Sequence, residues 1–289
     1  MHSNHSLGKS HIRQVLESRG IHPSKSLGQN FLVDPNVARR IVKISGIQDG
    51  DRVLEIGAGL GSLTVELAGA GAKVVAVEFD RNLIDILREH TYGQEVQIVH
   101  GDAMKMDFKE LLEDFDPAGK SWTMVSNLPY NIATPLVISM LTQVPRIKKM
   151  VIMVQKEVAQ RFIAKPNTKE YGASTLKIAY FANCKLEASF SPNIFLPVPN
   201  IESALVTMER NELLPTLDYK TFSDMVNAGF ANRRKMLRTT LSQMLSPFEI
   251  ESAGVDPSLR GEALNLEHFM ALSSAFKAKQ SSCDLRGES

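Results

Sequence analysis

The sequence predicts an α/β fold with a mostly parallel sheet, followed by a small all-α domain. Short apolar segments alternate with helical segments at spacings that suit right-handed βαβ crossovers. A glycine-rich turn follows the first buried strand directly. From residue 219 onward the apolar residues recur only at helical spacing.

The elements follow from local patterns along the chain. Asp34 before Pro35 predicts an N-cap with proline at the first helical position, opening a helix to about Ser45. Short apolar runs predict strands, and 3.6-residue periodicity predicts helices. The expected strands are 53–56, 73–77, 96–100, 122–126, 150–154, 177–182, 187–190 and 204–209. The expected helices between them are 62–70, 81–90 and 156–164.

Domain limits follow from changes in composition. We expect a polar N-terminal extension over 1–24 that leads into a first helix, and the α/β domain over 25–210. Residues 211–217 contain a proline and no clear periodicity, which indicates a linker. A helical domain is expected over 218–278, and a disordered polar tail over 279–289.

Composition indicates an ordinary globular protein, with 43% hydrophobic and 22% charged residues and a net charge of +1. No apolar run approaches the roughly 20 residues that cross a bilayer, and the polar start lacks the apolar core of a signal peptide. Cys184 and Cys283 form no disulfide framework and lack metal-ligand spacing. We therefore expect a cytoplasmic monomer without a metal.

Polar or glycine positions close four successive predicted strands: Gly57, Glu78, Asp102 and Asn127. Ligands of such sheets bind beyond the carboxyl ends of the strands. These four positions are therefore expected to border one binding site.

The glycine loop favours a methyl donor over a dinucleotide. Its spacing is Gly57-x-Gly59-x-Gly61, unlike the G-x-G-x-x-G of dinucleotide folds, and the acidic Glu55 precedes it. A second carboxylate disfavours a pyrophosphate but complements a sulfonium donor that carries an ammonium group. The sequence thus favours a sulfonium donor, with a dinucleotide as the alternative.

Other donor contacts are expected from the next strand ends. Glu78 is placed to accept hydrogen bonds from two ribose hydroxyls, a role that dinucleotide folds share. Asp102 could accept from an adenine amino group, with Ala103 lining the ring, or could simply cap a helix. Phe79 could cover another face of that adenine, but a core position is the favoured interpretation.

Asn127-Leu128-Pro129-Tyr130 predicts a pocket for a planar amine. An exocyclic adenine nitrogen is a poor nucleophile, so catalysis must orient it rather than deprotonate it. The Asn127 side-chain oxygen and the Leu128 carbonyl can accept its two N–H groups. Pro129 fixes the backbone and Tyr130 can stack on the base. Phe195, between stiffening prolines, is the candidate for the opposite face, with a buried anchor as the alternative.

Basic residues cluster in two places despite the near-neutral charge. One cluster is Arg146, Lys148 and Lys149, and the other is Arg233-Arg234-Lys235 with Arg238. Either cluster alone is more typical of a solvated surface.

Taken together, these motifs resemble the ribosomal RNA adenine N6-dimethyltransferases of the small-subunit type. The resemblance covers about residues 25–208, and Asn232–Lys235 resembles the second domain of that family. The matching segments are 25–32, 55–61, 77–80, 101–104, 127–130, 155–158 and 195–204. It implies a Rossmann-like class I methyltransferase domain that uses S-adenosyl-L-methionine.

The resemblance also implies site residues and a partner. Asn30 and Leu32 would contact the donor from the N-terminal loop. Gly57, Glu78, Asp102 and Asn127 would hold it from the strand ends. The acceptors would be two adjacent adenines near the 3′ end of 16S rRNA in the small ribosomal subunit. Arg233, Arg234, Lys235 and Arg238 would then face RNA.

Three alternatives share parts of this pattern. The sister family methylates one large-subunit adenine and confers macrolide resistance, but the Phe195–Pro199 segment resembles the small-subunit type more closely. A ribosome-assembly factor with secondary methylation is a second alternative. A small-molecule methyltransferase is the third, and it leaves the basic helical domain unexplained.

Overall fold

The computed structural model describes residues 7–24 and 27–287, with side chains up to residue 281. The chain forms two compact units. The first comprises Met1–Ala159 and Asn183–Arg210, and the second comprises Gln160–Ala182 and Asn211–Ser289. Residues 160–182 therefore group with the helical unit. The expected domain limits had placed them in the α/β domain of residues 25–210.

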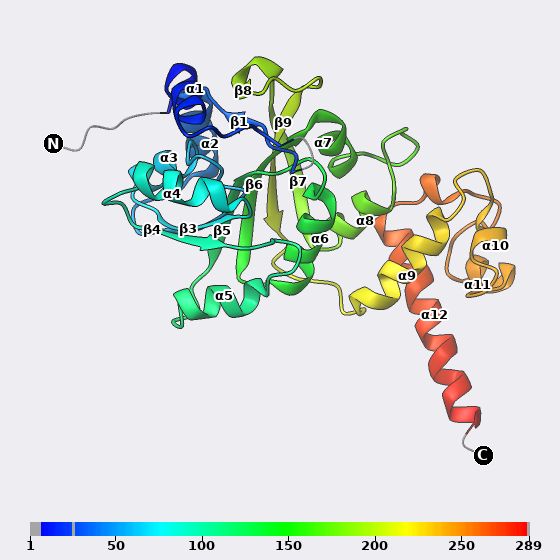
Figure 1. Cartoon of the computed structure of the whole chain (residues 1–289). Helices are drawn as coiled ribbons and strands as arrows, with labels where there is room; N and C mark the ends of the chain where they lie inside the picture. Colours follow the sequence, from blue (N-terminus) through cyan, green and yellow to red (C-terminus); the bar gives the residue numbers. More distant parts are fainter. Residues whose placement is uncertain (1–6, 25–26, 288–289) are drawn as a thin grey trace. The chain divides into compact units, whose positions relative to one another are not determined.

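A seven-stranded sheet forms the centre of the first unit (Figure 1). Its order is β4-β3-β2-β5-β6-β9-β7, with parallel pairing from β4 to β6 and antiparallel pairing of β6 with β9. Its strands are β2 (Arg52–Ile56), β3 (Lys73–Glu78), β4 (Val96–His100), β5 (Trp122–Asn127), β6 (Ile147–Gln155), β7 (Ala182–Phe190) and β9 (Ser203–Arg210). The prediction of a mostly parallel sheet is confirmed. β1 (Phe31–Leu32) and β8 (Phe195–Leu196) form a separate antiparallel pair, which the sequence did not predict.

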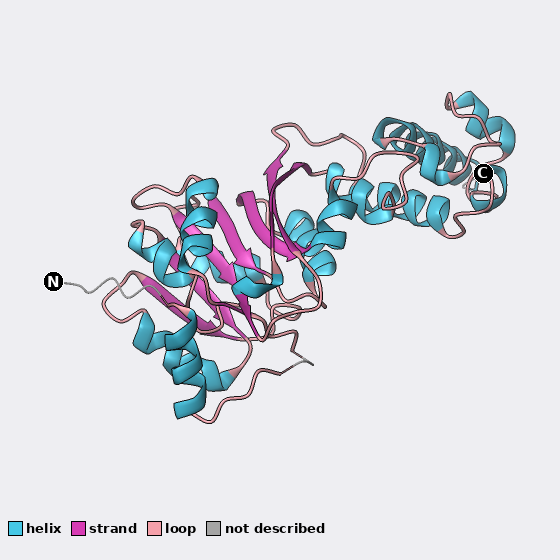
Figure 2. Cartoon of the chain, turned by 90° about the horizontal axis from the view of Figure 1, so that it is seen from above, coloured by secondary structure: helices cyan, strands magenta, loops and turns pink. Residues whose placement is uncertain are grey.

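Helices cover both faces of this sheet (Figure 2). The helices of the first part of the chain are α1 (Lys9–Ser18), α2 (Pro35–Ser45), α3 (Thr64–Gly69), α4 (Arg81–His90), α5 (Phe108–Phe115), α6 (Ala133–Gln143) and α7 (Lys156–Phe162). α2 begins where the sequence predicts, because Asp34 Oδ1 accepts a hydrogen bond of 2.9 Å from the Asn36 N–H. α4 has the predicted bounds and is capped in the same way by Asp80.

The N-terminal segment is more than a polar extension. α1 buries Ile12 and Leu16 against a cluster that includes Phe31, Leu60 and Leu83. Leu60 belongs to the glycine-rich turn, so α1 packs beside that turn. The polar appearance of the segment reflects its outer face, while two apolar residues one turn apart make the contact.

The second unit is helical within its described residues. Its helices are α8 (Ala173–Ala179), α9 (Tyr219–Phe230), α10 (Leu237–Thr240), α11 (Pro247–Ser252) and α12 (Leu266–Gly287), and it also contains the short 3₁₀ helix η2 (Gly261–Ala263). The other short 3₁₀ helix, η1 (Pro192–Ile194), belongs to the first unit. The strand expected over 177–182 is wrong, because α8 buries Thr175, Leu176 and Ile178 on one helical face. Short apolar runs do not distinguish strand from helix by periodicity alone. The tail expected to be disordered over 279–289 is helical through Gly287.

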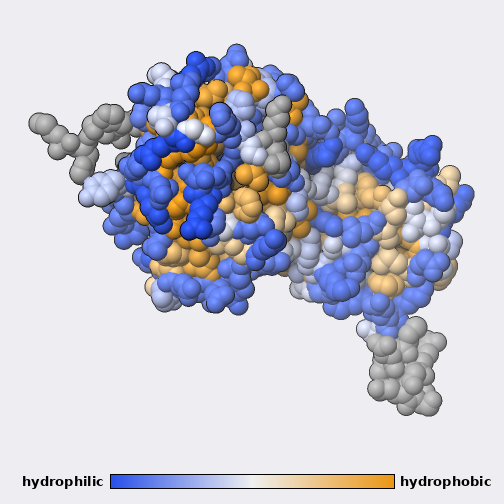
Figure 3. All heavy atoms as spheres, viewed as in Figure 1, coloured by the Kyte–Doolittle hydropathy of each residue, from blue (hydrophilic) through white to orange (hydrophobic). Residues whose placement is uncertain are grey.

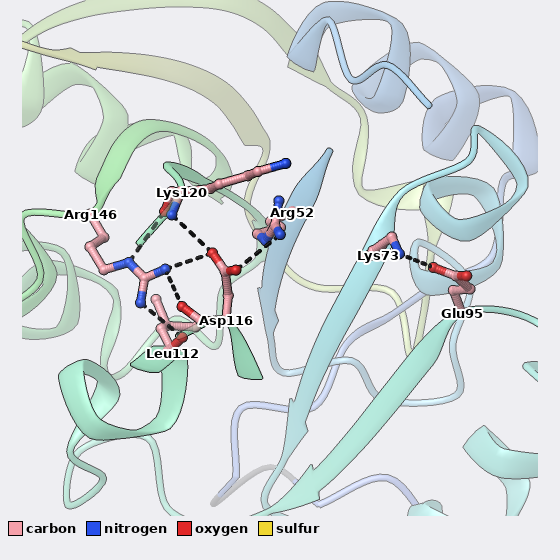
Figure 4. Close-up of polar contacts among 7 residues, drawn as sticks. All are labelled: Arg52, Lys73, Glu95, Leu112, Asp116, Lys120 and Arg146. Atoms are coloured by element: carbon pink, nitrogen blue, oxygen red, sulfur yellow. Dashed lines mark hydrogen bonds and ion pairs between the residues drawn. The ribbon is translucent and has the colours of Figure 1, made fainter. Parts of the chain in front are cut away.

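At the edge of the sheet where strands β2 and β5 begin, charged residues form a compact cluster (Figure 4). Asp116, whose side chain is 4% exposed, accepts from Arg52 at 3.0 Å and from Arg146 at 2.7 Å. Arg146 also donates to the carbonyls of Leu112 and Lys120. Arg146 therefore belongs to a largely buried ion-pair cluster, and the favoured interpretation of it as a solvated surface residue is wrong.

The face of the molecule seen in Figure 3 is mainly hydrophilic, with apolar residues showing between the polar ones. Among the described residues, no helix combines the length and the apolar character that crossing a membrane requires.

Candidate active site

A cavity of about 320 Å³ lies beyond the carboxyl ends of the parallel strands. All four predicted strand-end positions, Gly57, Glu78, Asp102 and Asn127, line it. Residues of the N-terminal loop complete its wall, Asn30 and Leu32 among them. Residues that lie about 100 positions apart in the sequence thus meet at this cavity, as expected for the carboxyl ends of parallel strands.

The sheet opens at this cavity because β2 and β5 separate. Their pairing covers only Val53 with Thr123 and Leu54 with Met124. Beyond it, the Ile56 N–H donates to the Ser126 hydroxyl at 2.9 Å instead of to a strand carbonyl. The order in which strands are added to the sheet also reverses here: β3 and β4 lie on one side of β2, and β5 lies on the other side. A crevice at such a switch point is the usual ligand site of an open α/β sheet.

The glycine loop is held against this crevice in a conformation that requires glycine. Gly57 and Gly59 have φ values of 76° and 58°. A Cβ at Gly59 would lie 3.2 Å from the Phe31 ring. The Gly59 N–H donates to Glu78 Oε2 at 2.7 Å, which ties the loop to the end of β3.

Two buried carboxyl groups line the cavity. Glu55 is 2% exposed, and its Oε2 has no hydrogen-bond partner within the described part of the chain. The pKa of Glu55 is raised to about 8, mainly by burial; the Thr64 hydroxyl opposes this rise and the Glu78 charge adds to it. An acceptor left without a donor beside a glycine loop fits a ligand that brings its own cationic donor, such as the ammonium group of S-adenosyl-L-methionine.

Glu78 is buried as well, but its oxygens already have partners. Oε2 accepts from Gly59 and Oε1 accepts from the Asp80 N–H at 2.8 Å. Burial raises the pKa of Glu78, and these two bonds lower it. A carboxylate oxygen has more than one lone pair, so Glu78 can hold the loop and still accept from a ribose hydroxyl.

The residues expected around an adenine differ in their placement. Asp102 Oδ1 accepts from the Met104 N–H at 3.0 Å, and Oδ2 lies 3.5 Å from Lys105 Nζ. These bonds close a turn and cap no helix, because the next helix, α5, begins at Phe108 with Asp107 as its N-cap. Ala103 lines the cavity. Phe79 also lines the cavity and is 51% exposed, so the favoured core interpretation of Phe79 is wrong.

The acceptor loop borders the same cavity through Asn127, Leu128, Pro129 and Tyr130. Asn127 Nδ2 donates to the Asn30 carbonyl at 3.2 Å, which turns Oδ1 of the same amide away from that carbonyl. Within the described residues, no donor occupies Asn127 Oδ1 or the Leu128 carbonyl. The two acceptors that the sequence assigns to an amine are therefore open.

Tyr130 is half-buried, and its hydroxyl shares a hydrogen bond of 2.9 Å with Ser203 Oγ. Phe195 occupies a different environment. It is fully buried in the core cluster and is absent from the cavity wall. The expected stacking role of Phe195 is not supported, because pairing of β8 with β1 turns the ring inward, as the buried-anchor alternative held.

Gln29 is a cavity residue that the sequence reasoning missed. Its Nε2 donates to Asp80 Oδ2 at 2.8 Å, and its Oε1 accepts from the Ser24 N–H at 2.7 Å. It thereby links the N-terminal loop to the N-cap of α4. The only signal for it was its position beside Asn30 in a matched segment.

The basic residues of the helical unit divide into two kinds. Arg233 donates to the carbonyls of Lys169 and Tyr171 and lies 3.4 Å from Glu262, so it holds its own unit together. Arg234, Lys235 and Arg238 are exposed, and none of them has an ion pair among the described residues. Arg233 thus already has partners within its own unit, and contact of the other three with RNA stays a prediction.

Carboxylate, imidazole and thiol groups do not form a metal-binding cluster anywhere in the described ranges.

Comparison with protein families and curated proteins gives concordant results. Residues 22–277 match the family described as "Ribosomal RNA adenine dimethylase". A protein named "Ribosomal RNA small subunit methyltransferase A" from Magnetococcus marinus is 42% identical over 266 residues, covering 90% of this chain and 94% of the relative. A protein of the same name from Clostridium perfringens is 39% identical over 271 residues, covering 91% and 94%.

Solved structures share the fold at lower identity. A dimethyladenosine transferase from Plasmodium falciparum has a TM-score of 0.75 at 23% identity, covering 86% of this chain and 98% of that one. The 23S rRNA methyltransferase ErmE has a TM-score of 0.65 at 24% identity, covering 86% and 100%. These likenesses establish the class I methyltransferase fold.

Proposed function

The chain belongs to the ribosomal RNA adenine dimethylase family, and from that premise we propose that it dimethylates two adjacent adenosines near the 3′ end of 16S rRNA. The acceptor atoms are the N6 nitrogens of both bases, and S-adenosyl-L-methionine is the methyl donor. The substrate is the small ribosomal subunit. We also propose a cytoplasmic site of action and a monomeric enzyme, as the sequence leads us to expect.

A single observation carries this proposal: Asn127 belongs to the cofactor cavity and to the acceptor loop at once. One side of Asn127 contacts Asn30 of the N-terminal loop. The next residues of the chain, Leu128 to Tyr130, border the same cavity. A donor in the cavity and a base at the loop would therefore be neighbours, as group transfer requires.

The chain's own groups would act on the acceptor by orientation. Asn127 Oδ1 and the Leu128 carbonyl would accept the two N6 hydrogens, which directs the nitrogen lone pair into the cavity. Tyr130 would stack on the base. Such neutral hydrogen-bond acceptors orient the nitrogen without a strong base. They are effective because they are already in place and do not have to move during the reaction.

Residues around the cavity would hold the donor. Glu55 would face its ammonium group, Glu78 would accept from its ribose, and Asp102 with Ala103 and Phe79 would surround its adenine. When bound, the donor supplies an electrophilic methyl group on a positively charged sulfur. Gly57 and Gly59 leave room for the backbone to approach it.

The exposed cations Arg234, Lys235 and Arg238 support an RNA partner. A subunit presents phosphates in a fixed shape, and exposed cations can contact them. Arg234 and Lys235 have no ion pair among the described residues, while the charge of Arg238 helps to lower the pKa of Asp256. Near-neutral net charge suits an enzyme that must release its substrate after reaction.

The decisive experiment uses methyl-labelled S-adenosyl-L-methionine and small subunits that lack the dimethyladenines. Large subunits and fully methylated small subunits are the controls. We expect label as dimethyladenosine in the undermethylated small subunits alone. Label in large-subunit RNA would reassign the enzyme to the resistance type, and donor binding without label in any RNA would refute the proposed acceptor.

A role in subunit assembly is a second candidate that the same geometry accommodates. Asn127 is remote in sequence from the exposed cations of the helical unit, so chemistry and RNA binding use different residues. We expect Asn127→Ala to bind small subunits with unchanged affinity and to transfer no methyl groups. An Asn127→Ala protein that restores normal subunit maturation in cells lacking the enzyme would make methylation secondary.

A further inference from the structure

Tyr130 is held at two ends by different parts of the sheet. On its backbone side, the Leu128 N–H donates to the Met153 carbonyl at 3.0 Å, which extends the pairing of β5 with β6 into the acceptor loop. On its side-chain side, the phenol hydroxyl meets Ser203 Oγ at 2.9 Å. The acceptor loop is thus tied to β6 by the Leu128 backbone and to the first residue of β9 by the Tyr130 hydroxyl.

Ser203 is a firm support for that hydroxyl. It is fully buried, and it pairs with Gln155 in the register of β6 with β9. The preceding residue, Glu202, accepts a 2.9 Å bond from the Lys156 N–H and forms an exposed ion pair with Lys156. Both supports of Tyr130 are therefore fixed on the same strand, β6, at Met153 and at Gln155.

The burial of Phe195 increases the importance of this contact. Of the rings that line the cavity, Phe31 lies over the glycine loop and Phe79 follows β3, so Tyr130 is the aromatic residue of the acceptor loop. Stacking depends on the plane of the ring, and a tyrosine side chain without a hydroxyl partner can rotate about two torsions. A bond at the far end of the ring holds the hydroxyl oxygen in place and so fixes the first torsion. It restrains the second torsion through the preference of the phenol O–H for the plane of the ring.

We infer that Ser203 is a positioning residue for methyl transfer: its hydroxyl fixes the axis of the Tyr130 ring and restrains the plane that receives the acceptor base. This inference rests on the proposed function, because it assigns the base to Tyr130. Ser203 itself touches neither donor nor base. Its effect passes through the phenol hydroxyl alone.

A double-mutant cycle tests this inference on the full-length protein. Ser203→Ala and Tyr130→Phe each remove one half of the bond, and each should lower the methylation rate on undermethylated small subunits about fivefold to tenfold, the usual effect of one hydrogen bond. The double variant should be no slower than either single variant. Affinity for S-adenosyl-L-methionine should be unchanged in all three.

Thr207→Val is the matched control. Thr207 is a buried hydroxyl residue on the same strand, and its Oγ1 has no partner among the described residues. We expect this variant to keep the wild-type rate. An equal loss of rate in Thr207→Val would show that disturbance of β9, not the Tyr130 contact, lowers the activity.

NMR of ¹³C-labelled tyrosine gives a readout that does not depend on activity. The chain has five tyrosines, and Tyr130→Phe identifies the Tyr130 signal by its disappearance. Burial raises the pKa of the Tyr130 phenol while the Ser203 bond lowers it, so Ser203→Ala should shift this signal and raise the pKa further. If the Tyr130 signal and its pKa are unchanged, or if Ser203→Ala lowers the rate equally in the Tyr130→Phe protein, the inference is wrong. A wild-type protein that is inactive on every RNA would refute the proposed function, and the NMR result would still decide the contact.

Discussion

The backbone of Gly57 lies against the ring of Pro129. A Cβ placed on Gly57 would be 3.2 Å from Pro129 Cδ and 3.5 Å from Pro129 Cγ. The first glycine of the donor loop thus leaves the space in which the proline ring of the acceptor loop lies. A side chain at position 57 would meet that ring, so glycine lets the two halves of the site approach each other.

Gly57→Ala should therefore damage catalysis more than folding. The new methyl group would push Pro129 by a few tenths of an ångström, and small displacements of a reacting group lower rates strongly, here by at least about tenfold. The positive φ of 76° adds strain of about 1 kcal/mol. Methylation rate and melting temperature measure the two effects.

Gly93→Ala is the control for that strain. Gly93 has a φ of 77°, and a Cβ there would meet nothing within 4 Å. We expect a similar loss of stability and a normal methylation rate. Equal loss of activity in both variants would show that strain, not the contact with Pro129, is responsible.

Glu55 should make stability depend on pH in a particular direction. Its folded-state pKa of about 8 lies above the ordinary value of 4.5, so the fold favours the protonated form. The resulting stabilisation is complete below about pH 4.5 and is lost as the pH rises to about 8. Glu55→Gln, which cannot ionise, should raise the melting temperature more at pH 8.5 than at pH 5. An equal shift at both values would contradict a raised pKa at this position.

Substitution of Asp116 should lower the free energy of unfolding more than substitution of most other charged residues of the first unit. Asp116→Asn would leave Arg52 and Arg146 beside a neutral amide, and removal of one partner from a largely buried ion-pair cluster costs about 3 kcal/mol. Asp85→Asn is the comparison, because Asp85 and Arg88 form an ion pair with side chains 78% and 64% exposed. We expect it to change the free energy of unfolding by well under about 1 kcal/mol. Urea denaturation measures both.

Neighbouring arginines of the helical unit should behave differently. Arg233→Ala removes bonds to two carbonyls and should lower the melting temperature. Arg234→Ala and Lys235→Ala should leave it unchanged, weaken binding to small subunits and reduce the salt dependence of that binding. Loss of subunit binding in Arg233→Ala without loss of stability would return Arg233 to the RNA-facing set.

Local patterns accounted for much of the fold. The helix at Arg81–His90 and the strand at Val96–His100 have the predicted bounds, because both have strong periodicity and clear boundaries. The region around α8 was misjudged, since a short apolar run fits either a strand or a helix until its packing partners are known. The pairing of β1 with β8 joins segments more than 160 residues apart, and no local pattern encodes such a contact.

The sequence by itself determined that four strand-end residues meet at one site, because the end of every parallel strand faces the same edge of the sheet. Gly57, Glu78, Asp102 and Asn127 follow from that rule alone. Only the tertiary structure decided which side chains face the cavity. It turned Phe195 into the core and Phe79 toward the cavity, and it gave Tyr130 its bond to Ser203. Side-chain direction depends on strand register and on neighbours distant in the chain, and these are settled only when the sheet and its flanking loops pack together.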